Sequence, residues 1–248
     1  MSDSPRLFPT TSQTLLSLIH DVDSRTREVS VARFCTVYYP SIYGYARALG
    51  LSEPDAQDLV QDFFVEVVRD GLLQRFDPLK NTRLSTWLMA CFRNQVNSHH
   101  AARKTQKRGG SSEFVEFNPE HAEHSYRAAH LAHLAPEPTF DLMLAREIWQ
   151  AAKATLLHKH ARKGNRDLVA DLLPFTLLDR WPPRPLPTQE ELAARHQTTL
   201  VKLKAFFNRT LKAQARSRFD EECLRDCPGI TEADIQHLWN LLCKYGED

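Results

Sequence analysis

Residues 52–71 read SEPDAQDLVQDFFVEVVRDG, and this stretch determines the expected fold. Leu59, Phe63 and Val67 recur at spacings of four, so on an α-helix they form one apolar stripe. Strict alternation of apolar and polar residues, the pattern typical of a strand, is missing from the stretch. We therefore expect a helix over about 53–70 that packs one side against a core.

The same helix carries a row of acidic side chains. Asp55, Asp58, Asp62 and Glu66 follow at spacings of three and four, so they share one side of the helix. Like charges at these spacings cost a few tenths of a kcal/mol per pair, which a basic partner surface could offset. The row also fits a solvated face of an amphipathic helix. A magnesium site is the weakest interpretation, because carboxylates stacked along one helix seldom converge on one ion.

The periodicity of this helix extends over most of the chain and predicts an all-α protein. Glycine is scarce, at 8 of 248 residues, and apolar residues recur at spacings of three and four. With ends uncertain by a few residues, helices are expected at about 11–21, 29–49, 53–70, 83–104, 140–162, 166–178, 188–196, 199–224 and 231–244.

The apolar period fades between residues 109 and 138, where glycine and proline interrupt the chain. This pattern predicts two helical domains, residues 1–108 and 139–248, joined by a flexible linker over 109–138. A proline-rich break at 181–187 is expected to separate two helices of the second domain.

The net charge of +1 hides a strong segregation of charge along the chain. All charged residues from Arg93 to Arg108 are basic, and so are all those from Lys202 to Arg218. Two acid-free basic helical segments indicate contact with nucleic acid.

Several function classes find no support in the sequence. It lacks a glycine-rich phosphate loop, a nucleophile elbow and a four-ligand zinc pattern, so we expect no catalytic residue, no cofactor and no metal site. No apolar run reaches the roughly 20 residues of a membrane span, and residues 1–9 do not resemble an export signal. We expect a cytoplasmic protein without membrane insertion, whose five cysteines are free thiols.

The helix expected over 83–104 combines an aromatic residue, arginines and amides outside its apolar side. Such a surface suits single-stranded or melted DNA, because bases stack on rings and phosphates pair with cations. Trp87 fits this exposed face and the core equally well. The candidates on this face are Arg83, Thr86, Trp87, Arg93, Asn94, Asn97 and Ser98, followed by the basic cluster Arg103, Lys104, Lys107 and Arg108.

A helix-turn-helix is expected near residues 188–212. TQEE at 188–191 has the pattern of a capping box, and a turn follows near 196–198. Ala193 and Leu203 stand ten residues apart, as in units whose second helix enters the major groove. A plain helical hairpin in a bundle would show the same apolar pattern, although its outer surface would usually mix charges of both signs.

Several motifs in this order resemble the second conserved region of extracytoplasmic-function sigma factors of RNA polymerase, and the helix-turn-helix resembles their fourth region. The motifs are YYP at 38–40, YGYAR at 43–47, PDAQDLVQDFF at 54–64, RFDP at 75–78 and RLSTWL at 83–88. RGG at 108–110, FDEE at 219–222 and LWNLL at 238–242 look most like a branch frequent in planctomycetes and their relatives. One departure is Gln197, which stands in a turn where the family usually has glycine.

The resemblance implies a sigma factor that binds core RNA polymerase and directs promoter-specific initiation. It assigns polymerase binding to Asp55, Asp58, Gln61, Asp62 and Glu66. It assigns recognition and melting of the minus-ten element to the candidates on the helix over 83–104 and to the basic cluster after them. Binding of the minus-thirty-five element falls to Thr198, Thr199, Lys202, Lys204, Asn208, Arg209 and Lys212.

Two other classes of protein stay open at this point. One is a helix-turn-helix regulator that works without polymerase, and the other is a helical adaptor that binds no DNA. An anti-sigma factor or another regulator is a further partner that the resemblance leaves open. The helix after Phe219 has no role that the resemblance implies.

Overall fold

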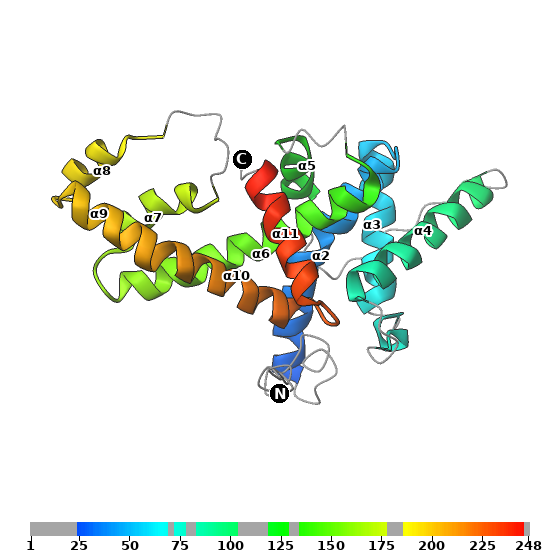
Figure 1. Ribbon diagram of the computed structural model, residues 1–248. Helices are drawn as coiled ribbons and strands as arrows, with labels where there is room; N and C mark the ends of the chain where they lie inside the picture. The colour runs from blue at the N-terminus through cyan, green and yellow to red at the C-terminus, as the bar shows by residue number, and fades with distance from the viewer. Residues whose placement is uncertain are drawn as a thin grey trace, which may run out of the picture.

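Helices form all of the regular secondary structure in the computed structural model (Figure 1), which describes residues 24–68, 72–77, 83–103, 119–128, 134–177 and 186–245. No strand occurs within these ranges, so the prediction of an all-α fold is confirmed. None of the helices in these ranges combines the length and the apolar character that crossing a membrane requires. The helix expected at 11–21 lies outside the described residues.

The N-terminal helices match their expected positions to within a few residues, except that α2 begins earlier. They are α2 (Ser24–Ala48), α3 (Glu53–Val68) and α4 (Leu84–Arg103). The short 3₁₀ helix η1 (Leu72–Arg75), which was not predicted, lies between α3 and α4 along the chain. Both α3 and α4 pack against α2 and against each other. Their interface is aromatic: the ring of Phe63 packs edge-on against Phe64 at 5.9 Å and against Phe92 at 5.3 Å between centroids.

A helix that the sequence did not predict, α5 (Pro119–Ala128), lies within the expected linker. It packs on α2, where the Tyr43 hydroxyl donates a 2.6 Å hydrogen bond to Glu123 and Arg47 forms an ion pair with the same carboxylate at 3.3 Å. Glu123 is buried, as is Ala122 beside it. Its apolar contribution to the core is short, Ala122 and Tyr126, and the polar contacts of Glu123 add to it, so a search for a long apolar period does not find this helix.

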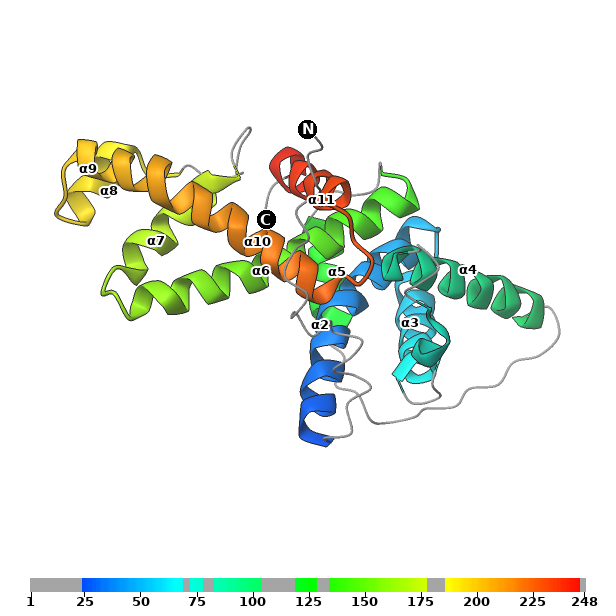
Figure 2. The same ribbon diagram turned by 60° about the horizontal axis from the view of Figure 1, so that its bottom comes forward.

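The C-terminal part of the chain is built on the long helix α6. Its elements are α6 (Pro136–Ala161), α7 (Arg166–Leu172), the 3₁₀ helix η4 (Leu173–Thr176), α8 (Gln189–Arg195), α9 (Leu200–Phe206), the π-helical turn η5 (Phe207–Leu211), α10 (Lys212–Asp226) and α11 (Glu232–Tyr245). α9, η5 and α10 follow one another without a break as one long rod (Figures 1 and 2). This rod corresponds to the helix expected at 199–224.

α6 joins the two ends of the molecule, because it packs against α2 as well as against α7, α10 and α11. Gly44 on α2 permits the close approach, since a Cβ at this position would lie 2.8 Å from Cγ of Met143. On its other side α6 contributes Trp149, whose ring packs edge-on against Trp239 of α11 at 5.8 Å. Buried side chains from α2 to α11 thereby form one continuous core. The domain boundaries at 108 and 139 stay a prediction.

Candidate nucleic-acid interface

The acidic face expected on α3 lies at the surface. Asp58, Gln61 and Asp62 are exposed, whereas Asp55 and Glu66 are half-buried. On the opposite side of the helix the apolar stripe of Leu59, Phe63 and Val67 is buried, as predicted. The helix therefore presents three polar side chains to solvent while its apolar side packs in the core.

Two of these carboxylates, Asp55 and Asp62, interact with neighbouring groups of the folded chain. The Ser52 hydroxyl accepts a hydrogen bond from the Asp55 backbone N–H and donates one to the Asp55 carboxylate at 2.8 Å, so Asp55 stabilises the start of α3. Burial raises the pKa of Asp62, the negative charge of Asp58 raises it further, and the positive charge of His99 on α4 opposes both. The ionised form of Asp62 is therefore less favourable in the folded chain than in water.

α4 has one buried apolar side and one exposed polar side, as expected. Leu84, Leu88, Phe92 and Val96 are buried. The opposite side presents five exposed candidates, namely Thr86, Arg93, Asn94, Asn97 and Ser98. The backbone of Arg103 forms the end of α4, its side chain is outside the described part, and Lys104, Lys107 and Arg108 lie outside the described residues altogether.

The sequence left open whether Trp87 is exposed or part of the core, and in the structure it is partly both. Its side chain is half-buried and packs edge-on against Phe76, with ring centroids 5.5 Å apart. Phe76 itself is buried, so the contact joins Trp87 to the core while part of the tryptophan side chain stays exposed. A partly exposed ring in this position can still stack on an unpaired base.

Two arginines of the α4 surface are already paired with carboxylates from the C-terminal part of the chain. Nη1 of Arg83 lies 3.0 Å from Oδ1 of Asp234 on α11. Nη2 of Arg93 lies 2.8 Å from Oε1 of Glu137 on α6, and the same guanidinium lies 5.7 Å from the ring centroid of Tyr45. These pairs were not predicted from the sequence, because the partners are more than 40 positions apart along the chain.

Two short helices joined by a turn, α8 and α9, lie where the sequence predicts a helix-turn-helix. Thr188 and Glu191 form the capping box at the start of α8, with hydrogen bonds of 3.1 and 2.7 Å. Gln197 has φ +49°, the left-handed conformation that glycine adopts most easily. Ala193 and Leu203 are buried, in agreement with the close crossing that their spacing predicts.

The surface of α9 and the following turn carries the second set of candidates. Lys202, Lys204, Asn208, Arg209 and Lys212 are exposed, as is Thr199, whereas Thr198 is half-buried. Thr199 also caps α9, because its hydroxyl accepts a hydrogen bond from the Lys202 backbone N–H at 3.3 Å. The structure places this surface and the α4 surface at opposite ends of the molecule (Figures 1 and 2).

An anchor for α8 was not expected from the sequence. Asp171 of α7 pairs with Arg195 at 2.9 Å and with His196 at 2.8 Å, so it ties the end of α8 and the turn to α7. Burial alone would raise the pKa of Asp171, but the hydrogen bonds from His196 and Arg195 outweigh it and lower the pKa. Asp171 therefore links α8 and the turn after it to α7.

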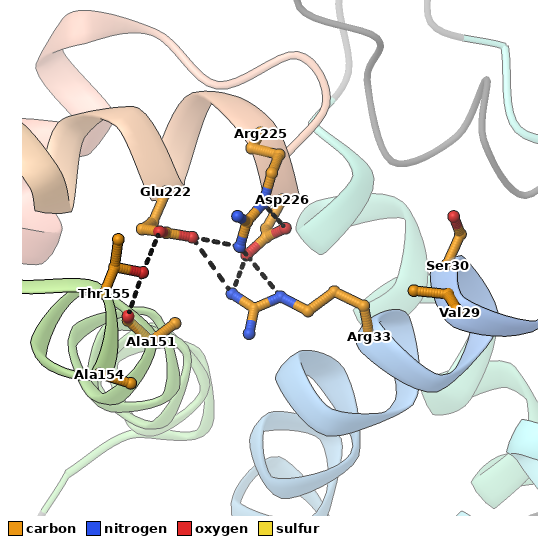
Figure 3. A pocket seen from close by; sticks show the side chains of 9 residues that line it. All are labelled: Val29, Ser30, Arg33, Ala151, Ala154, Thr155, Glu222, Arg225 and Asp226. Atoms are coloured by element: carbon orange, nitrogen blue, oxygen red, sulfur yellow. Dashed lines mark hydrogen bonds and ion pairs between the residues drawn. The ribbon is translucent and has the colours of Figure 1, made fainter. Parts of the chain in front are cut away.

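A second unexpected feature is a buried cluster of charges where α2, α6 and α10 meet (Figure 3). Arg33 of α2 reaches toward Glu222 and Asp226 of α10, and Arg225 contacts the same two carboxylates. Glu222 and Asp226 are 2% and 0% exposed, and a cavity of about 470 Å³ lies beside them. The two arginines compensate both carboxylates, so the cluster has the form of a structural junction.

The part of the chain that the structure describes contains no group of three or more histidine, cysteine, aspartate or glutamate side chains placed to hold a metal ion. All five cysteines are free, as the sequence predicted. Burial raises the pKa of Cys35 to about 12, so its thiol is unreactive near neutral pH.

A comparison with known protein families found a match, and it covers the segment that contains α3 and α4. Residues 35–106, from α2 to beyond the end of α4, match the family Sigma-70 region 2. Neither the comparison with curated proteins nor that with solved structures gave a match. The family match supports a sigma factor, and thereby a role in promoter recognition with core RNA polymerase and promoter DNA as partners.

Proposed function

We propose that this chain is a sigma factor of the extracytoplasmic-function type, which binds core RNA polymerase and directs promoter-specific initiation in the cytoplasm. The exposed acids of α3 bind the polymerase, the polar side of α4 recognises and melts the minus-ten element, and α9 binds the minus-thirty-five element. The polymerase supplies the catalysis, and the proposal assigns no catalytic residue to this chain.

The match of residues 35–106 to Sigma-70 region 2 carries the proposal. The geometry within that segment agrees with it: an acidic exposed face on α3 stands beside the amide-rich exposed side of α4. Asn94, Asn97 and Ser98 offer hydrogen-bond donors and acceptors to base edges, and Trp87 offers part of a ring for stacking.

The helix-turn-helix supports a second contact, with duplex DNA. α9 presents lysines and an arginine at the surface, and helix-turn-helix units place this second helix in the major groove. Because the α4 surface and α9 lie at opposite ends of the molecule, one chain can contact two separate promoter elements.

The decisive experiment is initiation in vitro. The purified chain and core polymerase from the same organism are incubated with fragments of its genome, and the transcript starts are sequenced. We expect new, discrete starts that depend on the chain. If the chain neither binds core polymerase nor produces such starts, the proposal is wrong.

Charge reversal on α3 tests the assignment of the polymerase surface. We expect Asp58→Lys and Asp62→Lys to weaken binding to core polymerase by about tenfold or more, since each converts an attraction into a repulsion. Asp167→Lys is the matched control, because its carboxylate on α7 is 88% exposed and lies far along the chain from α3. Equal loss in all three variants would indicate a general charge effect. Strong binding to duplex without any affinity for core polymerase would favour a helix-turn-helix regulator that works without polymerase.

A further inference from the structure

The segment after α10 lies against the start of α4. We call the loop at residues 227–231 together with α11 the C-terminal clasp. The carbonyl oxygen of Pro228 in this clasp accepts a 3.2 Å hydrogen bond from the backbone N–H of Leu84. Asp234 of α11 holds the side chain of Arg83, one residue before α4. Two successive residues at the start of the proposed minus-ten surface are therefore bound by the end of the chain.

Asp234 uses its two carboxylate oxygens for two different contacts. Oδ2 accepts hydrogen bonds from the backbone N–H and the hydroxyl of Thr231, at 3.0 and 2.7 Å, and so caps α11. Oδ1 lies 3.0 Å from Arg83. The cap fixes the position of the carboxylate, so that Arg83 meets an anion that is already in place.

The clasp is held in place by the buried charge cluster at the end of α10 (Figure 3). Arg33 of α2 pairs with Asp226, the last residue of α10, through Nε at 3.0 Å. The hydroxyl of Tyr38 donates a 2.9 Å hydrogen bond to the backbone oxygen of the same residue. These buried contacts set the point from which residues 227–231 cross to α4.

We propose that the C-terminal part of the chain is autoinhibitory: Asp234 of the clasp occupies Arg83 and Glu137 of α6 occupies Arg93, and these are the arginines with which α4 would bind the minus-ten strand. The proposal rests on the function proposed above. A DNA phosphate and the Asp234 carboxylate compete for the same guanidinium of Arg83, and likewise a phosphate and Glu137 for Arg93. The free chain therefore binds single-stranded DNA more weakly than the exposed amides of α4 would allow, and promoter binding by the holoenzyme must displace the clasp.

The test measures binding of the isolated full-length chain to a fluorescein-labelled single-stranded DNA of about 20 nucleotides with mixed sequence, by fluorescence anisotropy. Asp234→Asn keeps an oxygen that can cap α11 but removes the charge that holds Arg83, and Glu137→Gln does the same for Arg93. We expect the double variant to bind about three- to tenfold more tightly than the wild type, since partly exposed ion pairs contribute modestly.

A second double variant, Glu232→Gln/Asp167→Asn, controls for net charge, because it also removes two negative charges. Glu232 lies in the exposed first turn of the same helix as Asp234, and Asp167 lies on α7. We expect this control to bind within about twofold of the wild type, because neither carboxylate holds Arg83 or Arg93. An equal gain in the control and in Asp234→Asn/Glu137→Gln would overturn the proposal, and so would no gain in Asp234→Asn/Glu137→Gln.

Hydrogen exchange at the Leu84 amide gives a second reading that does not depend on DNA. Asp234→Asn should accelerate exchange at this amide, because its acceptor Pro228 belongs to the clasp. Unchanged exchange would contradict release of the clasp. If the variants leave DNA binding and hydrogen exchange unchanged while the wild type still directs initiation, the autoinhibition proposal is wrong and the proposed function stands. If the variants bind DNA more tightly but the chain has no affinity for core polymerase, the proposed function is wrong and the contact of the clasp with Arg83 still limits DNA binding.

Val201 on α9 supports a second inference, which rests on the proposed binding of α9 to duplex DNA. Its side chain is 77% exposed, the highest value among the large apolar side chains that the structure describes. Val201, Lys204 and Asn208 stand at spacings of three and four and are all exposed, so they share the outer side of the helix. An apolar group on this side has no core to fill.

We infer that Val201 contacts the methyl group of a thymine in the major groove, which distinguishes thymine from the other bases by apolar contact. The probe is a duplex that the chain itself selects from a random library, in which deoxyuridine replaces thymine one position at a time. At one position of the duplex we expect deoxyuridine to weaken the affinity of the wild type by about threefold and to leave the affinity of Val201→Ala unchanged. Val29→Ala on α2 is the control, because Val29 is 65% exposed, and it should lose the same affinity as the wild type. The inference fails if Val201→Ala loses as much as the wild type, if no position matters, or if the chain selects no duplex.

Discussion

Replacement of Arg33 by methionine tests the buried junction between α2 and α10. Arg33 is 24% exposed and compensates Asp226 and Glu222, which are almost fully buried. Methionine keeps a long apolar side chain at this position and removes only the charge and the hydrogen bonds. The variant leaves two buried carboxylates with a single cation, Arg225, whose side chain is 43% exposed.

The expected loss follows from this geometry. Removing one partner of a buried ion pair typically costs about 3–5 kcal/mol, because a buried charge loses its compensation. Arg225 still contacts both carboxylates, at 3.0 Å from Asp226 through Nε, so part of the compensation remains. We therefore expect the free energy of unfolding to fall by about 2–3 kcal/mol, which lowers the melting temperature by about 5–10 °C in a chain of this size.

Urea and thermal unfolding, followed by circular dichroism, measure this loss. Arg27→Met is the matched control, because Arg27 lies on the same helix with an exposed side chain. In Arg33→Met/Asp226→Asn one buried charge disappears together with its partner, so the loss should be smaller than the sum of the two single losses. The reasoning is refuted if the free energy of unfolding of Arg33→Met lies within about 0.5 kcal/mol of that of Arg27→Met, or if the losses of the two single variants add up to that of the double variant.

Three further predictions concern the two proposed interfaces. The pKa of Asp62 is raised above its ordinary 3.8 by burial and by Asp58, so its ionised form destabilises the folded chain above that pH. Asp62→Asn should therefore raise the free energy of unfolding at pH 7, measured by urea titration. This gain should shrink toward zero as the pH falls to about 3.8, and an unchanged free energy of unfolding at pH 7 would contradict the prediction. Gln197→Gly should stabilise the chain by about 1 kcal/mol in thermal unfolding, because glycine adopts φ +49° without strain, and a loss of stability would show that the glutamine side chain contributes more than the strain. Lys204→Ala and Arg209→Ala should each weaken duplex binding and lower the slope of log affinity against log salt by about 1, while binding to core polymerase stays unchanged.

The sequence predicted most of the helices and the orientation of their faces. The buried stripe of α3, the polar side of α4 and the capping box at Thr188 were all expected, and the structure confirms them. Each depends on residues three or four positions apart, and the geometry of a single helix brings such residues together. The family match covers residues 35–106, which contain α3 and α4.

The tertiary structure alone decided which charged side chains meet. Arg83 lies 151 positions from Asp234 along the chain, and Arg33 lies 193 positions from Asp226, so no local pattern connects them. The same reason explains α5, which is held on α2 by the buried Glu123 and has no long apolar stripe. It also explains Trp87, whose partial burial depends on where the chain places Phe76. The sequence by itself determined helices, faces and charge segregation, because these follow from neighbours on one helix. Which arginines are neutralised within the folded chain depended on how α6, α10 and α11 pack against α2 and α4, and only the tertiary structure sets that packing.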